Sequence, residues 1–191
     1  MNSLFIKAAF WFAALIISAS PVLAATYVID PSHTYPLFEI DHLGFSIQRG
    51  QFDDTRGVIE IDQATQTGRI EIQVQTASLD SGHTQRDEIL KGIDWFDSAQ
   101  FPLMSYRSQQ LVFNGNQLVA VEGELTLRGI TRPLKLDITR YKCGLNLAAR
   151  KRGCGADASG VLKRSAFGMT TGLPFVGDEI RLRIQVEAYA E

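Results

Sequence analysis

Apolar and polar residues alternate most clearly in the stretch Leu118–Ile138. Two arms, joined at Arg128-Gly129, each place apolar side chains on one face and polar side chains on the other. A period of two is typical of a strand with one buried face. Gly129 tolerates the positive φ of a tight reversal, so the arms are predicted to pair as an antiparallel hairpin. The inward residues expected in this hairpin are Val119, Val121, Leu125, Leu127, Leu134, Leu136 and Ile138.

The same alternation returns along most of the chain. Outside the hairpin, strands are expected at residues 26–30, 35–43, 52–62, 69–75, 103–113, 156–165 and 178–189. With the hairpin, these segments give about eight principal strands. That number closes an antiparallel sheet into a barrel, whose interior is either filled by side chains or holds one small ligand.

Residues 80–101 interrupt the alternation. Thr84 and Asp87 occupy the positions of an N-cap and of the third helical residue, and apolar residues at helical spacing follow. One short helix, capped by Thr84, is therefore predicted, which makes the fold all-β with a single helix. Trp95 and Phe96 follow this helix. They could plug the barrel or face a second subunit of a homodimer, and the pattern leaves both interpretations open.

Residues 1–24 have the features of a signal peptide. Lys7 precedes an apolar run, residues 8–19, that is too short to span a bilayer comfortably, and Val22-Leu23-Ala24 resembles a signal-peptidase site. We expect cleavage before Ala25 and export to the periplasm. Residues 25–191 are then expected to form a single domain with no stable membrane insertion.

Charge and composition exclude one class of partner. The formal net charge is −2, and removal of Lys7 with the leader would make it −3. Lysines and arginines are scattered, and no basic stripe carries interleaved aromatic residues, so nucleic acid is not an expected partner.

The two cysteines, Cys143 and Cys154, are expected to form a disulfide. An even cysteine count in an exported protein favours a bridge, and the spacing is not that of a redox-active CxxC motif. The pair brackets residues 141–155, which lack alternation and are predicted to be a loop. We interpret the bridge as structural.

Neither metal binding nor catalysis has a clear sequence signal. His33, His42 and His83 lie far apart and form no metal-binding motif, so no metal site is expected. No nucleophile elbow or phosphate-binding loop is present, so no catalytic residue is proposed. His42 has the register of Phe38 and Ile40, which predicts an inward side chain that serves as a polar contact in a core or pocket.

Four segments together resemble a known family. They are HLGFSIQRGQFDDTRGVIEID (42–62), HTQRDEILKGIDWFDSAQFPLMSYRS (83–108), GELTLRGITRPLKL (123–136) and CGADASGVLKRSAFGM (154–169). In this order they resemble the signatures of the YceI-like family. The resemblance implies an extended, lipocalin-like antiparallel β-barrel in the periplasm. It also implies that the interior binds a polyisoprenoid, such as an isoprenoid quinone or a prenyl phosphate, without any required cofactor.

The expected ligand-binding residues are the large side chains assigned to the inner face. They are Phe38, Ile40, His42, Ile59, Ile61, Ile70, Ile72, Trp95, Phe96, Val121, Leu125, Leu134, Leu136, Leu182 and Ile184. Small inward residues at Gly123, Gly160 and Ala188 are expected to leave room for the ligand, because a closed core would fill such positions.

Two alternatives compete with the binding of a lipid. A barrel with a solid core could act through its surface as a stress-related structural or interaction protein. A hydrolase or isomerase of prenyl substrates could use His42 or His83 with a nearby acid. An apolar molecule bound to the purified protein would favour the lipid-binding hypothesis over both.

Overall fold

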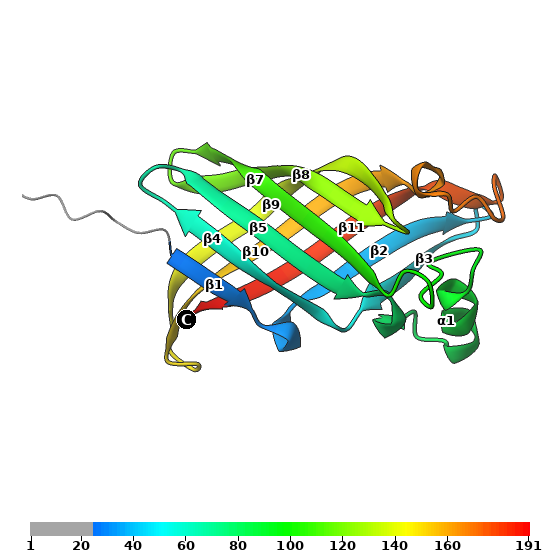
Figure 1. The fold of residues 1–191 in the computed structure, drawn as a ribbon, viewed down its shortest axis with the longest axis horizontal. Coiled ribbons are helices and arrows are strands. Elements are labelled where there is room, and N and C mark those ends of the chain that lie inside the picture. Colours follow the sequence, from blue (N-terminus) through cyan, green and yellow to red (C-terminus); the bar gives the residue numbers. More distant parts are fainter. Residues whose placement is uncertain (1–24) are drawn as a thin grey trace, which may run out of the picture.

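The structure is a computed structural model that describes residues 25–191, and the expected signal peptide lies outside the described residues. The chain forms an elongated antiparallel barrel with helix α1 (Thr84–Lys91) near one end (Figure 1). The strands are β1 (Ala25–Ile29), β2 (Tyr35–His42), β3 (Ser46–Phe52), β4 (Thr55–Asp62), β5 (Thr67–Gln75), β6 (Leu79–Asp80), β7 (Leu103–Asn114), β8 (Gln117–Leu127), β9 (Ile130–Asn146), β10 (Lys151–Lys163) and β11 (Val176–Ala190).

These strands behave as eight long strands, because three of the eight are broken in the middle. β1 and β2 both pair with β11 and are separated by the short 3-10 helix η1 (Pro31–His33). The next long strand consists of β4, which pairs with β1, and β3, which pairs with β2. The long strand after it consists of β5, which pairs with β4, and β6, which pairs with β3. Pairing of β1 with both β4 and β11 closes the ring. The expected all-β, lipocalin-like barrel of about eight strands with one short helix is confirmed.

The barrel wall is incomplete at the end that carries α1. In the part of the chain that the structure describes, β6 pairs only with β3, so the sheet order ends there although β5 pairs with β7. The segment between β6 and β7 contains α1 and Phe96. The Phe96 ring packs against Phe38 and Phe52, at centroid distances of 6.2 and 5.2 Å. Phe96 thus extends the barrel interior toward α1.

The helix begins at Thr84, the residue that was predicted to be its N-cap, and the N-cap is His83. The Nδ1 atom of His83 accepts a hydrogen bond from the backbone N–H of Arg86 at 3.3 Å. The Asp87 carboxylate accepts from the backbone N–H and the hydroxyl of Ser81, in the turn before the helix. The predicted cap at Thr84 is therefore wrong by one residue, because the acid that suggested a capping box bonds to Ser81 instead.

One expected inward residue, Val119, is on the outside. In the pairing of β7 with β8, Val112 lies opposite Ala120 but Phe113 lies opposite Leu118. Val119 is therefore an extra residue of β8 and forms a β-bulge. Such a bulge shifts the alternation of the strand that contains it. Leu118 and Val121 are consequently buried, whereas Val119 is exposed.

The two inward glycines leave no space of their own. A Cβ atom at Gly123 would lie 2.7 Å from the ring and the hydroxyl of Tyr106, and one at Gly160 would lie 2.9 Å from Leu136. Neighbouring side chains have therefore filled the room that was expected at these glycines. Ala188, with 1% of its surface exposed, does line the space inside the barrel. The expectation that small residues open the interior is therefore wrong for Gly123 and Gly160.

The segment that was expected to be a loop, residues 141–155, is mostly paired strand. β9 and β10 stay in register through it, and only residues 147–150 form the turn. Cys143 and Cys154 face each other in this register and form the expected disulfide. The strands were missed because glycine, alanine and basic residues in this stretch show no apolar–polar alternation.

The disulfide is expected to contribute stability without determining the fold. Replacing both Cys143 and Cys154 with serine should lower the free energy of unfolding by about 2–3 kcal/mol. Without the bridge between these residues, which are 11 positions apart, the unfolded chain has more conformational entropy. Urea denaturation measures this loss, and the far-ultraviolet circular dichroism should stay unchanged. Two reactive thiols in the untreated, oxidised protein would contradict the bridge.

A candidate ligand cavity inside the barrel

A cavity of about 370 Å³ lies inside the barrel. Tyr141 and Cys154, near the β9–β10 hairpin, contribute to its wall, and so do Ile89 and Trp95 at the end that carries α1. The two groups come from opposite ends of the elongated barrel (Figure 1). The cavity is therefore long, and strands from the whole circumference supply its wall.

All the residues predicted to bind the ligand line this cavity. They come from β2 (Phe38, Ile40, His42), β4 (Ile59, Ile61), β5 (Ile70, Ile72), the segment after α1 (Trp95, Phe96), β8 (Val121, Leu125), β9 (Leu134, Leu136) and β11 (Leu182, Ile184). Because inner-face residues of every strand meet in one interior, the alternation was sufficient to find those that lie in strands. Trp95 and Phe96 lie outside the strands and were assigned from the aromatic segment after the helix.

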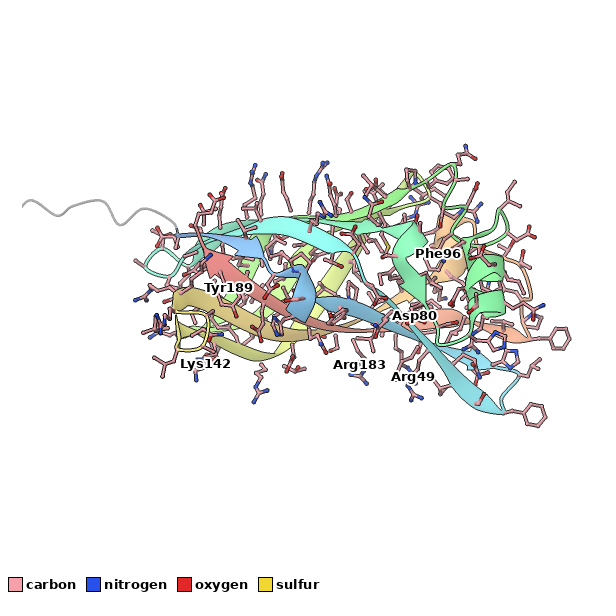
Figure 2. All side chains as sticks on the ribbon, turned by 90° about the horizontal axis from the view of Figure 1, so that it is seen from below. Arg49, Asp80, Phe96, Lys142, Arg183 and Tyr189 are labelled. Atoms are coloured by element: carbon pink, nitrogen blue, oxygen red, sulfur yellow. A yellow bond between two sulfur atoms is a disulfide. The ribbon has the colours of Figure 1, made fainter. Side chains whose placement is uncertain are left out.

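Of the two interpretations of His42, a core residue or a polar contact in a pocket, the structure agrees with the pocket. The side chain lines the cavity but is exposed, at the end of β2 where it pairs with Ser46 and Val176. Two other lining residues, Arg49 and Ile89, are also exposed. Arg49 and Phe96 lie toward the same end in Figure 2. The cavity thus reaches solvent near α1, and His42 belongs to that rim.

Sequence reasoning missed the most unusual residue of the wall. Arg164 lines the cavity and is only 1% exposed. Its guanidinium donates hydrogen bonds to the carbonyl oxygens of Met169, Val176 and Gly177, at 2.7, 2.8 and 2.8 Å. The guanidinium carbon also lies 4.9 Å from the centre of the Trp95 ring. Arg164 therefore holds the loop before β11 against the segment after α1.

The carboxylate nearest to Arg164 has a different partner. Asp178 accepts hydrogen bonds from the backbone N–H and the hydroxyl of Ser165, both at 2.9 Å. Burial lowers the pKa of the Arg164 guanidinium below its usual range, and the charge of Asp178 opposes that shift. An arginine that bonds to backbone carbonyls needs no acidic residue at a recognisable spacing, so no sequence pattern indicated its role.

A second arginine stands on the same side of the cavity. Arg86 donates to the side-chain oxygen of Gln48 at 2.7 Å, and to the hydroxyl and carbonyl oxygens of Ser81 at 2.8 and 2.6 Å. Arg86, Gln48 and Ser81 all line the cavity. Farther along the wall, the Tyr106 hydroxyl donates to backbone carbonyls, and burial raises its pKa well above the usual range. Arg86 and Arg164, together with the exposed Arg49 of the rim, thus place the arginines of the wall toward the end that carries α1.

Residues 25–191 offer no cluster of three or more histidine, cysteine or acidic side chains that could hold a metal ion. Within the same residues, no helix is both long enough and apolar enough to cross a membrane.

Comparisons with known proteins agree with this architecture. Protein YceI of Escherichia coli O6:H1 is 33% identical over 179 residues, which cover 92% of this chain and 93% of that protein. The crystal structure of Burkholderia cenocepacia BcnA superposes with a TM-score of 0.69 at 21% identity, covering 83% of this chain and 98% of the other.

A third similar structure is a polyisoprenoid binding domain from Saccharophagus degradans that is implicated in plant cell wall breakdown. It has a TM-score of 0.65 at 15% identity, and covers 87% of this chain and 99% of that domain. At these identities the two structures show a shared fold. The family model of the YceI-like domain matches residues 27–188, nearly all of the described barrel. The chain therefore belongs to the YceI-like family.

Proposed function

We propose that this protein binds a long apolar lipid inside the barrel, without catalysis, and that it does so in the periplasm. The observation that carries the proposal is the long cavity, whose wall is built mostly of aliphatic and aromatic side chains. A polyisoprenoid, either an isoprenoid quinone or a prenyl phosphate, is the ligand class that we favour. The similar domain from Saccharophagus degradans is described as binding a polyisoprenoid, which supports this choice.

The shape of the cavity favours a chain over a compact ligand. Its volume of about 370 Å³ is at the small end of ligand pockets, yet its wall extends from the β9–β10 hairpin to α1. A narrow, long space suits an extended hydrocarbon. Each buried methylene contributes about 0.8 kcal/mol to binding, so a chain that occupies the whole length gains affinity without any polar contact.

The polar groups of the wall set the orientation of the proposed ligand. Arg86, Arg164 and His42 belong to the part of the wall near α1, whereas Ile61 and Ile70 lie in strands that run toward the other end. A lipid with its polar head near α1 and its tail along the barrel places each part in matching surroundings. Transport, storage and sequestration are all compatible with this arrangement.

The alternatives have less support. A solid barrel that acts only through its surface gives no reason for a continuous apolar cavity. For a hydrolase or isomerase, His83 would have to leave its role as the helix cap, where its Nδ1 atom accepts from Arg86. The disulfide fits export to an oxidising compartment.

Trp95 provides a direct test of ligand binding. It lines the cavity and is the only tryptophan after residue 24, so the fluorescence of residues 25–191 reports this side chain alone. Titration of the delipidated protein with a long-chain isoprenoid quinone should quench the fluorescence in a saturable way at about one molecule per chain. The quinone head group without its tail serves as the control and should quench only weakly. Equal quenching by both compounds, or no saturation, would refute binding of the tail.

A further inference from the structure

The tip of the β9–β10 hairpin, residues 140–152, carries a concentration of positive charge that the proposed cavity does not explain. We call this segment the basic tip. Its five basic residues are Arg140, Lys142, Arg150, Lys151 and Arg152. The sequence contains no acidic residue between Asp137 and Asp157. The hairpin turn lies at the end of the barrel opposite α1 (Figure 1).

These charges are mostly uncompensated. Only Arg140 has an acidic neighbour, Asp157 at 3.9 Å; among residues 25–191, the other four basic residues of the tip form no ion pair. Basic residues on the barrel surface elsewhere are commonly paired, such as Arg49 with Glu39 at 2.8 Å. The tip therefore presents a local positive field, although the whole chain has a net negative charge.

The same tip exposes two large apolar side chains. Leu145 is 61% exposed and Leu147 is 80% exposed. Leu145, near the end of β9, and Leu147, in the turn, are thus exposed to water among lysines and arginines. Bare apolar residues surrounded by basic residues are the combination that binds the interface of an anionic membrane.

Hydrogen bonds of Asn146 and the disulfide hold the tip in a defined conformation. The side-chain oxygen of Asn146 accepts from the backbone N–H groups of Ala148 and Ala149, at 3.0 and 3.1 Å. The side-chain nitrogen of Asn146 donates to the hydroxyl of Tyr189 at 2.8 Å. The disulfide joins the two strands just below. Figure 2 shows Lys142 and Tyr189 at this end of the barrel.

We propose that the basic tip docks the protein onto the surface of an anionic lipid bilayer. The lysines and arginines would contact lipid phosphates, while Leu145 and Leu147 would enter the boundary between head groups and acyl chains. A second copy of the chain is a poorer partner, because two identical tips would bring like charges together. Docking would place the end of the cavity that Tyr141 lines next to the membrane. The inference goes beyond ligand binding and does not depend on which molecule fills the cavity.

Flotation of residues 25–191, which contain every described element, with lipid vesicles tests the proposal. Vesicles of 70% phosphatidylcholine and 30% phosphatidylglycerol should bind the protein at least tenfold more tightly than vesicles of phosphatidylcholine alone. Each basic residue near an anionic surface contributes roughly a fivefold gain in affinity. Changing Lys142, Arg150, Lys151 and Arg152 together to glutamine should therefore weaken binding at least fiftyfold, and 0.5 M salt should weaken binding of the parent protein.

Two further double variants separate insertion from charge. Leu145→Ser with Leu147→Ser should weaken binding to the anionic vesicles several-fold and leave the melting temperature unchanged, since neither side chain is buried. Phe45→Ser with Phe175→Ser is the matched control. These two residues are 90% and 68% exposed, but they belong to the turn after β2 and the loop before β11. This control should bind as the parent protein does.

Three results would overturn the proposal. The first is no preference of the parent protein for phosphatidylglycerol. The second is equal binding by the parent protein and the glutamine variant. The third is a parent protein that binds neither kind of vesicle but elutes as a dimer in size-exclusion chromatography, while the variant with Leu145→Ser and Leu147→Ser elutes as a monomer. This result would assign the tip to contact with a second copy of the chain. None of these outcomes bears on the quenching of Trp95 by a ligand.

Discussion

Replacing Arg164 with methionine should lower the free energy of unfolding by about 3–5 kcal/mol. The substitution keeps the apolar stem but leaves the carbonyl oxygens of Met169, Val176 and Gly177 without their donor. An unsatisfied buried polar group costs about 1–3 kcal/mol, and Trp95 also loses the cation above its ring. The loss should appear as a lower urea midpoint with an unchanged slope.

Arg181 provides the matched control for this substitution. It is an exposed arginine on β11 that pairs with Glu179 at 3.1 Å. Because exposed ion pairs contribute little, Arg181→Met should change the free energy of unfolding by less than about 0.5 kcal/mol. Similar losses for Arg164→Met and Arg181→Met would show that Arg164 does not hold the loop. If Arg164→Met fails to fold, Arg164→Lys should give an intermediate loss, because an ammonium group cannot reach all three carbonyls in the same geometry.

Filling the cavity should abolish ligand binding while the empty barrel remains stable. Ala156 lines the cavity from β10, opposite Tyr141 and Val186, which also line it. A phenyl ring at this position would occupy space that a long chain needs. Ala156→Phe should weaken binding of a long-chain isoprenoid quinone at least a hundredfold in the titration of Trp95 fluorescence. The melting temperature of the ligand-free protein should change by only a few degrees.

The control places the same ring on the other face of the strand. Ser159 pairs with the outward residues Arg183 and Asp137 and does not line the cavity. Ser159→Phe should therefore leave binding unchanged. Inserting a ring into a packed core costs about 1–3 kcal/mol. A severe loss of stability in ligand-free Ala156→Phe, without a selective loss of binding, would favour the solid barrel that acts through its surface.

The inner face could be predicted from the sequence because a barrel imposes a simple rule. Ile59, Ile70 and Leu182 lie in three different strands, yet alternation alone assigns each of them to the interior. The prediction did not require knowledge of which strands are neighbours. Gly129 identified the turn between β8 and β9, where its φ is +70°.

Features that depend on the details of strand pairing, or that carry no apolar pattern, could not be predicted in this way. The bulge that exposes Val119 results from the register between β7 and β8. The paired strands around Cys143 and Cys154 contain too few apolar residues to alternate. Gly123 was expected to open the cavity, but the room that it provides is taken by Tyr106 from the neighbouring strand. The errors at Val119 and Gly123 concern how a residue meets the neighbouring strand, whereas the strands around the disulfide were missed for lack of an apolar pattern.

Arg164 shows the same limitation within the cavity. Its partners are backbone carbonyls in and after an irregular loop, and any residue type offers such an acceptor. The sequence around it, Lys163-Arg164-Ser165, resembles an ordinary solvated end of a strand. Only the folded chain brings the loop before β11 and Trp95 around the guanidinium.

Native mass spectrometry of the protein recovered from its own cells tests the central claim most directly. The account predicts a complex of one processed chain, beginning near residue 25, with one apolar molecule whose mass fits a long isoprenoid lipid. Protein that carries Ala156→Phe should be recovered without this molecule, whereas Ser159→Phe should retain it. A parent protein that is recovered empty, under conditions that preserve lipid complexes of other proteins, would contradict the account.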